Sequence, residues 1–291
     1  MKEPLDFARS INPSTVPGGG GDRFSGYAVL GLPFSSGHVL ALRRIEASSI
    51  GAAYTSVWQR DPDGRWTFHQ NVPPEQSCPR YFGAAISEHT TEPIRIDWSD
   101  GHRFRVTVGA PGEIMWDVRL AATPATRIMN AAASVMPSRW WEKRVVLSAM
   151  EAAARSILGT GQMNLTGRTP NGHAFMGIPR MIWRIAESRA TIRGVDVGTP
   201  APLDQQATLG DFRIPQRGIF ALFTSVLEGQ GNGGASGGVL AHQSGRKNPV
   251  SGTEPRWRGT VTPGAFPASP TSPESESAPS PDAAAVPAAP R

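Results

Sequence analysis

Apolar and polar residues alternate along much of the chain between residues 24 and 228, and this period of two is typical of β-strands. In residues 160–223, Asn171-Gly172 separates two long alternating runs. Asn-Gly favours a tight hairpin because both residues tolerate positive φ. Residues 190–197 form a third run soon after the second. The pattern therefore predicts an antiparallel meander of long strands that curls.

A shorter hairpin is predicted earlier in the chain, between residues 53–60 and 65–72. Asp61-Pro62-Asp63-Gly64 places proline at the second position of a turn and glycine at the fourth. This turn would pair Arg60 with Arg65. One face of the hairpin would then carry Tyr54, Ser56, Trp58, Thr67 and His69. Because such a face mixes aromatic rings with polar tips, it suits the wall of a pocket.

The period changes to three and four between residues 126 and 158, which predicts two amphipathic helices. Pro137 separates them, Ser138 is a suitable N-cap for the second helix, and Gly159 is placed as a C-cap. The apolar positions expected to face inward are Ile128, Ala131 or Ala132, Val135, Trp141, Val145, Ala149, Ala153 and Ile157. We expect this helical insertion to lie over the mouth or along the wall of a β structure.

About a dozen strands joined by tight turns favour a sandwich or a barrel, and closure of a barrel would hide the sheet edges. Strands and helices do not alternate, so a doubly wound nucleotide-binding fold is not expected. Residues 24–228 are predicted to form one mainly β, antiparallel barrel domain with the helical insertion at residues 126–158. Residues 1–23 are expected to be a flexible arm. Residues 229–291, rich in Gly, Pro, Ala and Ser, are expected to be a disordered tail.

The formal net charge of +5 comes almost entirely from arginines spread along the predicted strands. Nucleic-acid binding needs basic residues clustered on one face, so no nucleic-acid partner is expected. The single cysteine, Cys78, excludes an internal disulfide and a multi-cysteine metal cluster. The N-terminus lacks a signal pattern and no apolar run is long enough to span a membrane. We therefore expect a cytoplasmic protein without an integral membrane segment.

Known catalytic motifs give little guidance. Residues 229–234 match GxGxxG and residues 234–238 match GxSxG, but both lie in a glycine-rich segment that neither follows a strand nor opens a helix. Lys143 is flanked by charged residues on a predicted helix, which is typical of a surface lysine rather than of a Schiff-base lysine. The histidines have no local metal-ligand spacing, so no metal and no cofactor is predicted.

The candidate site is the mixed aromatic and polar surface. Tyr54, Trp58, His173 and Trp183 are the expected ligand-binding residues, because aromatic bodies with a few polar groups suit a flat or polyene-like apolar ligand. If the protein is an enzyme, His69 and Asp211 are the expected catalytic residues. An acid in the wall of an apolar cavity has its pKa moved by desolvation and can transfer a proton.

Five segments carry a resemblance to known proteins: SVWQRDPDGRWTFHQN, IRIDWSDGHRFRVTV, EIMWDVRLAATPATR, LTGRTPNGHAF and LGDFRIPQRGIFA. They look like a family of actinobacterial proteins over residues 25–223. More distantly, their tryptophan-rich strands resemble lipocalin-like (calycin) proteins of the carotenoid-hydratase type. This resemblance implies a calycin barrel that holds a hydrophobic ligand, and acid-initiated chemistry on a terpenoid. No catalytic residue is carried over from it.

Three functions remain open from the sequence. The first is binding of a hydrophobic small molecule, such as a lipid, terpenoid or polyketide, in a barrel cavity. The second is an acid-base enzyme (hydratase, cyclase or isomerase) that acts on such a ligand. The third is an interaction module whose proline-rich tail recruits protein partners.

Overall fold

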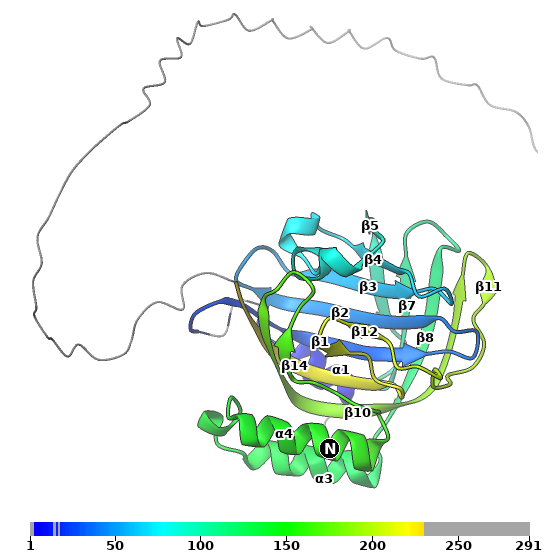
Figure 1. The fold of residues 1–291 in the computed structure, drawn as a ribbon. Coiled ribbons are helices and arrows are strands. Elements are labelled where there is room, and N and C mark those ends of the chain that lie inside the picture. The colour runs from blue at the N-terminus through cyan, green and yellow to red at the C-terminus, as the bar shows by residue number, and fades with distance from the viewer. Residues whose placement is uncertain (1–2, 14–15, 17, 230–291) are drawn as a thin grey trace, which may run out of the picture. The chain divides into compact units, whose positions relative to one another are not determined.

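A computed structural model describes residues 3–13, 16 and 18–229, and it is mainly β (Figure 1). The predicted tail lies outside the described residues except for Gly229, as do the two glycine-rich motifs apart from that residue. Among the described helices, none is both long enough and apolar enough to cross a bilayer.

Ten strands form one curled sheet in the order β5-β4-β3-β2-β1-β14-β10-β8-β7-β6. Their bounds are β1 Asp22–Pro33, β2 Val39–Ser48, β3 Tyr54–Arg60, β4 Trp66–Gln70, β5 Glu88–Thr91, β6 Ile94–Trp98, β7 Arg103–Val108, β8 Ile114–Ala121, β10 Ala174–Ile192 and β14 Ile219–Glu228. Two short strands, β9 (Thr166–Arg168) and β11 (Val195–Asp196), pair with β10. Another two, β12 (Thr208–Leu209) and β13 (Phe212–Arg213), form a separate ribbon.

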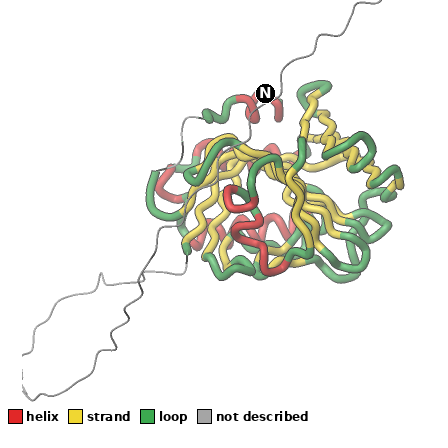
Figure 2. Tube along the Cα trace, turned by 90° about the horizontal axis from the view of Figure 1, so that it is seen from above, coloured by secondary structure: helices red, strands yellow, loops and turns green. Residues whose placement is uncertain are grey.

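The order of the strands is that of a meander in which β1 pairs with β14. The sheet is curled (Figure 2). Within the part of the chain that the structure describes, no pairing joins its two end strands, β5 and β6, so it is an open half-barrel rather than a closed barrel. The connection between β4 and β5 makes these two strands parallel. It contains η1 (Pro74–Gln76), α2 (Pro79–Phe82) and η2 (Gly83–Ala85). The expected mainly β fold is confirmed, whereas the expected full closure is corrected to a half-barrel; the lipocalin-like assignment stays a prediction.

The long strand β10 lies between β14 and β8 and links the two halves of the sheet. Its first half pairs with β14 and its second half, from Arg184 to Ile192, pairs with β8. Register shifts occur between Pro179 and Met181 and between Ile185 and Glu187. Proline cannot donate a ladder hydrogen bond, so an irregularity at Pro179 is expected. Such bulges bend a strand, which lets one strand serve both halves.

The two faces of the sheet pack into separate cores. In the first core, side chains from β1, β2 and β3 meet side chains from β7, β8 and the end of β10 inside the curl. Its members include Val29, Leu42, Val57, Val106, Trp116, Trp183 and Phe220. In the second core, the opposite face of β2, β3 and β4 packs against α2 and the β12–β13 ribbon. Its members include Ala41, Tyr54, Trp58, Phe68, Phe82 and Leu209.

The β3–β4 turn has one residue fewer than the sequence suggested, three instead of four. Asp61, rather than Arg60, faces Arg65, with a hydrogen bond from the Asp61 N–H to the Arg65 carbonyl at 3.0 Å. Gly64 has φ of +92°, as in a three-residue loop that ends in a left-handed residue. The register therefore shifts by one: Ser56 pairs with Gln70, and Val57 pairs with His69. A shift of one residue moves a whole strand face to the other side.

Two helices, α3 (Pro124–Val135) and α4 (Arg144–Ala153), cover β10 (Figure 1). Between them lies η3 (Ser138–Trp140), and α4 continues as a π-helical turn, η4 (Ala154–Leu158). Thr123 caps α3, with its hydroxyl accepting the Thr126 N–H. Gly159 has φ of +65°, which confirms the predicted C-cap.

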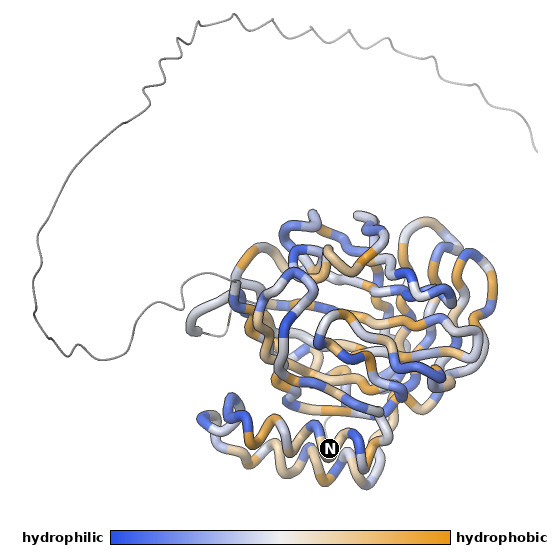
Figure 3. The backbone as a smooth tube through the Cα atoms, in the orientation of Figure 1, coloured by the Kyte–Doolittle hydropathy of each residue, from blue (hydrophilic) through white to orange (hydrophobic). Residues whose placement is uncertain are grey.

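The helical period was predicted correctly, but the buried face was not. Ile128, Val135 and Val145 are 72%, 80% and 81% exposed, while Asn130 and Leu147 face the sheet. Figure 3 shows hydrophobic and hydrophilic positions mixed along both helices. The buried face of α3 combines partly buried apolar side chains, Ala125, Met129 and Ala133, with a polar contact. The Asn130 side chain donates to the carbonyl of Ile182 and accepts its N–H, both at 2.9 Å.

The N-terminal segment contains a helix, α1 (Pro4–Arg9), where an arm was expected. Ala8 is 5% exposed and belongs to the first core, and the Phe7 ring lies 5.6 Å from that of Trp183. The single short apolar cluster of this segment is therefore used for packing.

Candidate ligand cavity

A cavity of about 120 Å³ lies on the face of the sheet that carries the second core. Strands β1, β2, β3, β10 and β14 supply one part of its lining, and three connecting segments supply the rest. These are the region of α2, residues 163–165 and residues 212–215. The lining is largely apolar and aromatic: Phe24, Tyr54, Trp58, Tyr81, Phe82, Phe175, Phe212 and Phe223 all contribute. Apolar cavities of about 150 Å³ hold a benzene molecule, so this space suits a ring or a segment of an alkyl chain.

Arg43 of β2 lines this cavity and is only 6% exposed. Its Nη1 donates to the carbonyl oxygens of Val29 at 2.7 Å and Leu42 at 2.9 Å, and its Nη2 donates to that of Leu30 at 3.2 Å. The guanidinium carbon lies 4.5 Å from the centroid of the Trp58 ring, within cation–π range. Burial lowers the pKa of Arg43 to about 10, so the group is still protonated at neutral pH.

The charge of Arg43 has no acidic partner. No ion pair involves Arg43 within the described ranges, and no Asp or Glu is among the residues that line the cavity there. A second arginine, Arg213 of β13, also lines the cavity. The cavity is therefore apolar with a purely cationic charge.

Two neutral polar groups lie close to Arg43. The Tyr54 hydroxyl and the Cys78 sulfur are 3.7 Å apart and both residues are buried. Burial raises the pKa of each, and the guanidinium of Arg43 opposes the shift without cancelling it. The thiol is thus protonated at neutral pH and not activated as a nucleophile.

A second, smaller void of about 40 Å³ lies beneath α3 and α4. Its lining includes Met129, Met150, Leu158 and Ile182, and it shares Leu30, Met163, Leu165 and Pro179 with the larger cavity. These shared residues lie against both spaces. Methionine is flexible and adapts its shape, so a methionine at this boundary can move to join them.

Of the six predicted site residues, Tyr54 and Trp58 line the cavity. Trp183 is 1% exposed and belongs to the first core, where it contacts Phe7 and Phe220. His173 lies behind the cavity wall, with its ring centroid 5.1 Å from that of Tyr81.

The other two predicted residues lie away from the cavity. Asp211 is exposed in the turn between β12 and β13, where its Oδ2 accepts the Arg168 N–H at 2.8 Å. His69 is on the opposite face of β4 because of the shifted register. The catalytic roles of His69 and Asp211 stay predictions, since nothing in their placement tests them.

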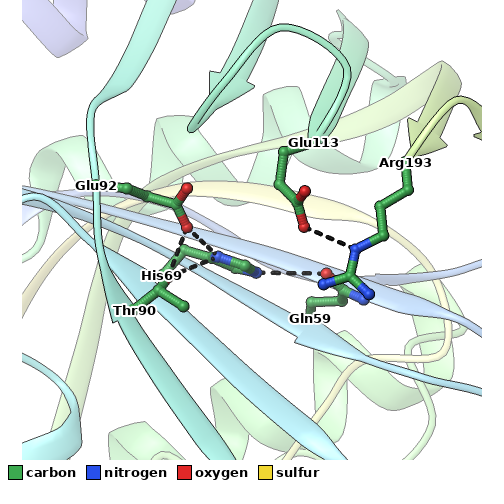
Figure 4. A network of polar contacts seen from close by, with 6 residues as sticks. All are labelled: Gln59, His69, Thr90, Glu92, Glu113 and Arg193. Atoms are coloured by element: carbon green, nitrogen blue, oxygen red, sulfur yellow. Dashed lines mark hydrogen bonds and ion pairs between the residues drawn. The ribbon is translucent and has the colours of Figure 1, made fainter.

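His69 is part of a separate polar network (Figure 4). Its Nδ1 lies 2.6 Å from Oε1 of Glu92 and 2.9 Å from the Thr90 hydroxyl, and its Nε2 lies 3.3 Å from Oε1 of Gln59. Burial acts to raise the pKa of Glu92, but hydrogen bonds from Thr90 and His69 outweigh it and lower that pKa below its ordinary value. His69 is 3% exposed. The network joins β3 and β4 to the short strand β5 and its following residue.

A Schiff-base lysine and a bound metal ion are two other kinds of catalytic group. Lys143, which precedes α4, is exposed, and the lining that the structure describes contains no lysine. Among residues 3–13, 16 and 18–229, no three His, Cys, Asp or Glu side chains are grouped so that they could hold a metal ion.

Arg43 is the buried charged residue of the cavity lining that the sequence reasoning missed. A signal for it was available, because Ala41, Arg43 and Ile45 alternate in β2 and must share one face. In β3, Ser56 pairs with Arg43 and Tyr54 with Ile45. An arginine in phase with an otherwise apolar stripe indicates a buried cation.

Comparisons with known proteins add little to this geometry. No protein-family model matches the sequence, and no curated protein is significantly similar to it. A solved structure of acetoacetate decarboxylase from Legionella pneumophila subsp. pneumophila str. Philadelphia 1 is similar with a TM-score of 0.33 and 9% sequence identity. That alignment covers 78% of this chain and 94% of the other. A likeness at this level supports no statement about the activity of this chain.

Proposed function

We propose that the protein binds a hydrophobic small molecule in the cavity between the sheet and α2. The observation that supports this is an aromatic-lined space of about 120 Å³ that contains a buried arginine without an acidic partner among the described residues. Small-molecule sites combine such apolar walls with a few placed polar groups. A space that served packing alone would have no use for a buried charge, which is costly to desolvate.

The acid-base alternative has weaker support. The two residues expected to transfer protons, His69 and Asp211, are not in the cavity lining, and three weakly acidic groups that are, Tyr54, Cys78 and Tyr81, are kept neutral because burial raises the pKa of each. Binding is therefore the function that the cavity supports best.

The first test uses 1-octanol as an apolar probe, with isothermal titration calorimetry of the purified full chain. We expect saturable binding at one site. Ser225 of β14 lines the cavity and pairs with Gly177 of β10, a residue without a side chain. A Ser225→Phe variant should fill this space and abolish binding.

The matched control is Ser225→Ala, which leaves the space open and should bind like the wild type. Mass spectrometry of an organic extract from the same preparations should also find a co-purified ligand in the wild type and not in Ser225→Phe. If 1-octanol does not bind and nothing is extracted, the proposed function is wrong.

A further inference from the structure

The buried charge of Arg43 restricts which molecule the cavity can hold. The residue is 6% exposed, and the described residues supply no carboxylate to it. Its neighbours Tyr54 and Cys78 are uncharged. A desolvated cation is stabilised by an opposite charge brought within hydrogen-bonding distance. The missing counterion is a role that a ligand can fill.

The donors of Arg43 are only partly used. A guanidinium carries five N–H donors. Three of them are accounted for by the carbonyls of Val29, Leu42 and Leu30. The Nε–H and one Nη2–H have no acceptor within the described part of the chain. These belong to the two nitrogens with which arginine binds a carboxylate side-on, through two parallel hydrogen bonds.

The space beyond Arg43 is apolar. The main cavity adjoins the void beneath α3 and α4, with Met163 and Leu165 among the residues shared by both linings. A ligand with its head at Arg43 can therefore extend an alkyl or terpenoid tail towards the helices.

We propose that the ligand is an apolar carboxylic acid whose carboxylate is bound by the guanidinium of Arg43 and whose tail extends towards the void beneath α3 and α4. This inference rests on the proposed function and adds the chemical class of the ligand. Arg213, the second arginine of the lining, is only partly buried and lies in the short strand β13. It serves as the comparison for Arg43.

The test compares three probes of equal chain length: octanoate, 1-octanol and octylamine. Without a cation, an apolar cavity prefers the alcohol, because a carboxylate must lose its hydration. We expect octanoate to bind the wild type at least tenfold more tightly than 1-octanol, and octylamine not to bind. Arg43→Met should remove this preference and retain binding of 1-octanol. Arg43→Lys should keep part of the preference, because it keeps the charge but not the two parallel hydrogen bonds.

Two controls keep the result interpretable. Arg213→Met should keep the preference for octanoate, and circular dichroism melting should show that each variant is folded. If Arg43→Met does not fold, the wild-type comparison of the three probes and the Arg213→Met variant decide the question.

The inference fails while the proposed function stands if wild type binds 1-octanol as tightly as octanoate. It also fails if the preference disappears in Arg213→Met. Absence of binding by all three probes contradicts both proposals together.

Discussion

The guanidinium carbon of Arg43 lies 4.5 Å from the ring centroid of Trp58, and both residues line the cavity. The Trp58 ring is also stacked on Phe68, with centroids 4.4 Å apart and 9° between the planes. Trp58 therefore holds a fixed position next to the proposed head-group site. The indole should respond directly when a carboxylate approaches Arg43.

From this arrangement we expect octanoate to change the tryptophan fluorescence of the wild type on titration. Trp58→Phe should lose most of this change while calorimetry still detects binding, because a phenyl ring preserves the stacking. Trp140→Phe is the matched control, since Trp140 is 46% exposed and outside the cavity lining. If Trp58→Phe keeps the full fluorescence change, octanoate binds elsewhere.

A row of buried polar residues crosses β2, β3 and β4, because Arg43 pairs with Ser56 and Ser56 pairs with Gln70. Gln70 is 0% exposed, and neither atom of its amide has a hydrogen-bond partner within the described protein. An unpaired buried polar group costs about 1–3 kcal/mol. We expect Gln70→Met, which keeps the volume, to raise the free energy of unfolding by about 1 kcal/mol in urea titrations.

The control for Gln70 is Gln59, whose Oε1 contacts His69 at 3.3 Å. Gln59→Met should lower the free energy of unfolding or leave it unchanged. A loss of stability in Gln70→Met would show that its amide is satisfied in solution.

The contact between Asn130 and Ile182 attaches α3 to β10. Asn130→Ala leaves the N–H and the carbonyl of Ile182 without this partner, and we expect the free energy of unfolding to fall by roughly 2–4 kcal/mol. Asn130→Asp should cost at least as much, because it replaces the amide donor with a buried carboxylate oxygen that faces the carbonyl of Ile182. The exposed neighbour Ser134 provides a control, because Ser134→Ala should change stability by no more than about 0.5 kcal/mol. Equal stabilities for Asn130→Ala and the wild type would contradict this assignment.

Glu92 should make the stability depend on pH in the acidic range. Its pKa in the folded protein is lower than its ordinary value of 4.5, so its stabilising contribution is present above that pH and is lost as the pH falls further. The wild type should therefore be more stable than Glu92→Gln above pH 4.5, and the difference should shrink below it. Denaturant titrations across this range measure the effect. Glu88→Gln, at an exposed position in β5, should differ less from the wild type in stability. If the stability difference between the wild type and Glu92→Gln does not vary with pH, the ionisation of Glu92 is not its source.

The sequence predicted the β class and the helical insertion because both depend on periodicity, which is a local property. It failed on the face of β4, since the turn has three residues between Asp61 and Arg65 instead of the expected four between Arg60 and Arg65, and this moved His69 away from Trp58. Only backbone geometry determines whether such a turn contains three residues or four.

The buried face of α3 could not be predicted for a different reason. The apolar stripe containing Ile128 and Val135 is exposed, and the side that packs contains Asn130, which bonds to a strand more than fifty residues away in the chain. Two of the six candidate site residues, Tyr54 and Trp58, line the cavity because they share the face of β3 irrespective of register. The residue that gives the cavity its charge, Arg43, becomes apparent only when β2 is added beside them.

The pairing of β1 with β14 has a consequence for how the chain is made. Residues Asp22 and Leu227 face each other across this pair, so one edge of β1 has no partner until nearly all of the described chain has left the ribosome. The β1–β4 hairpins can form early, but the cavity cannot, because its lining includes Ala221 and Phe223 of β14. Ligand binding thus becomes possible only when synthesis of the last strand is complete, and a nascent chain that stops short of β14 exposes an open strand edge.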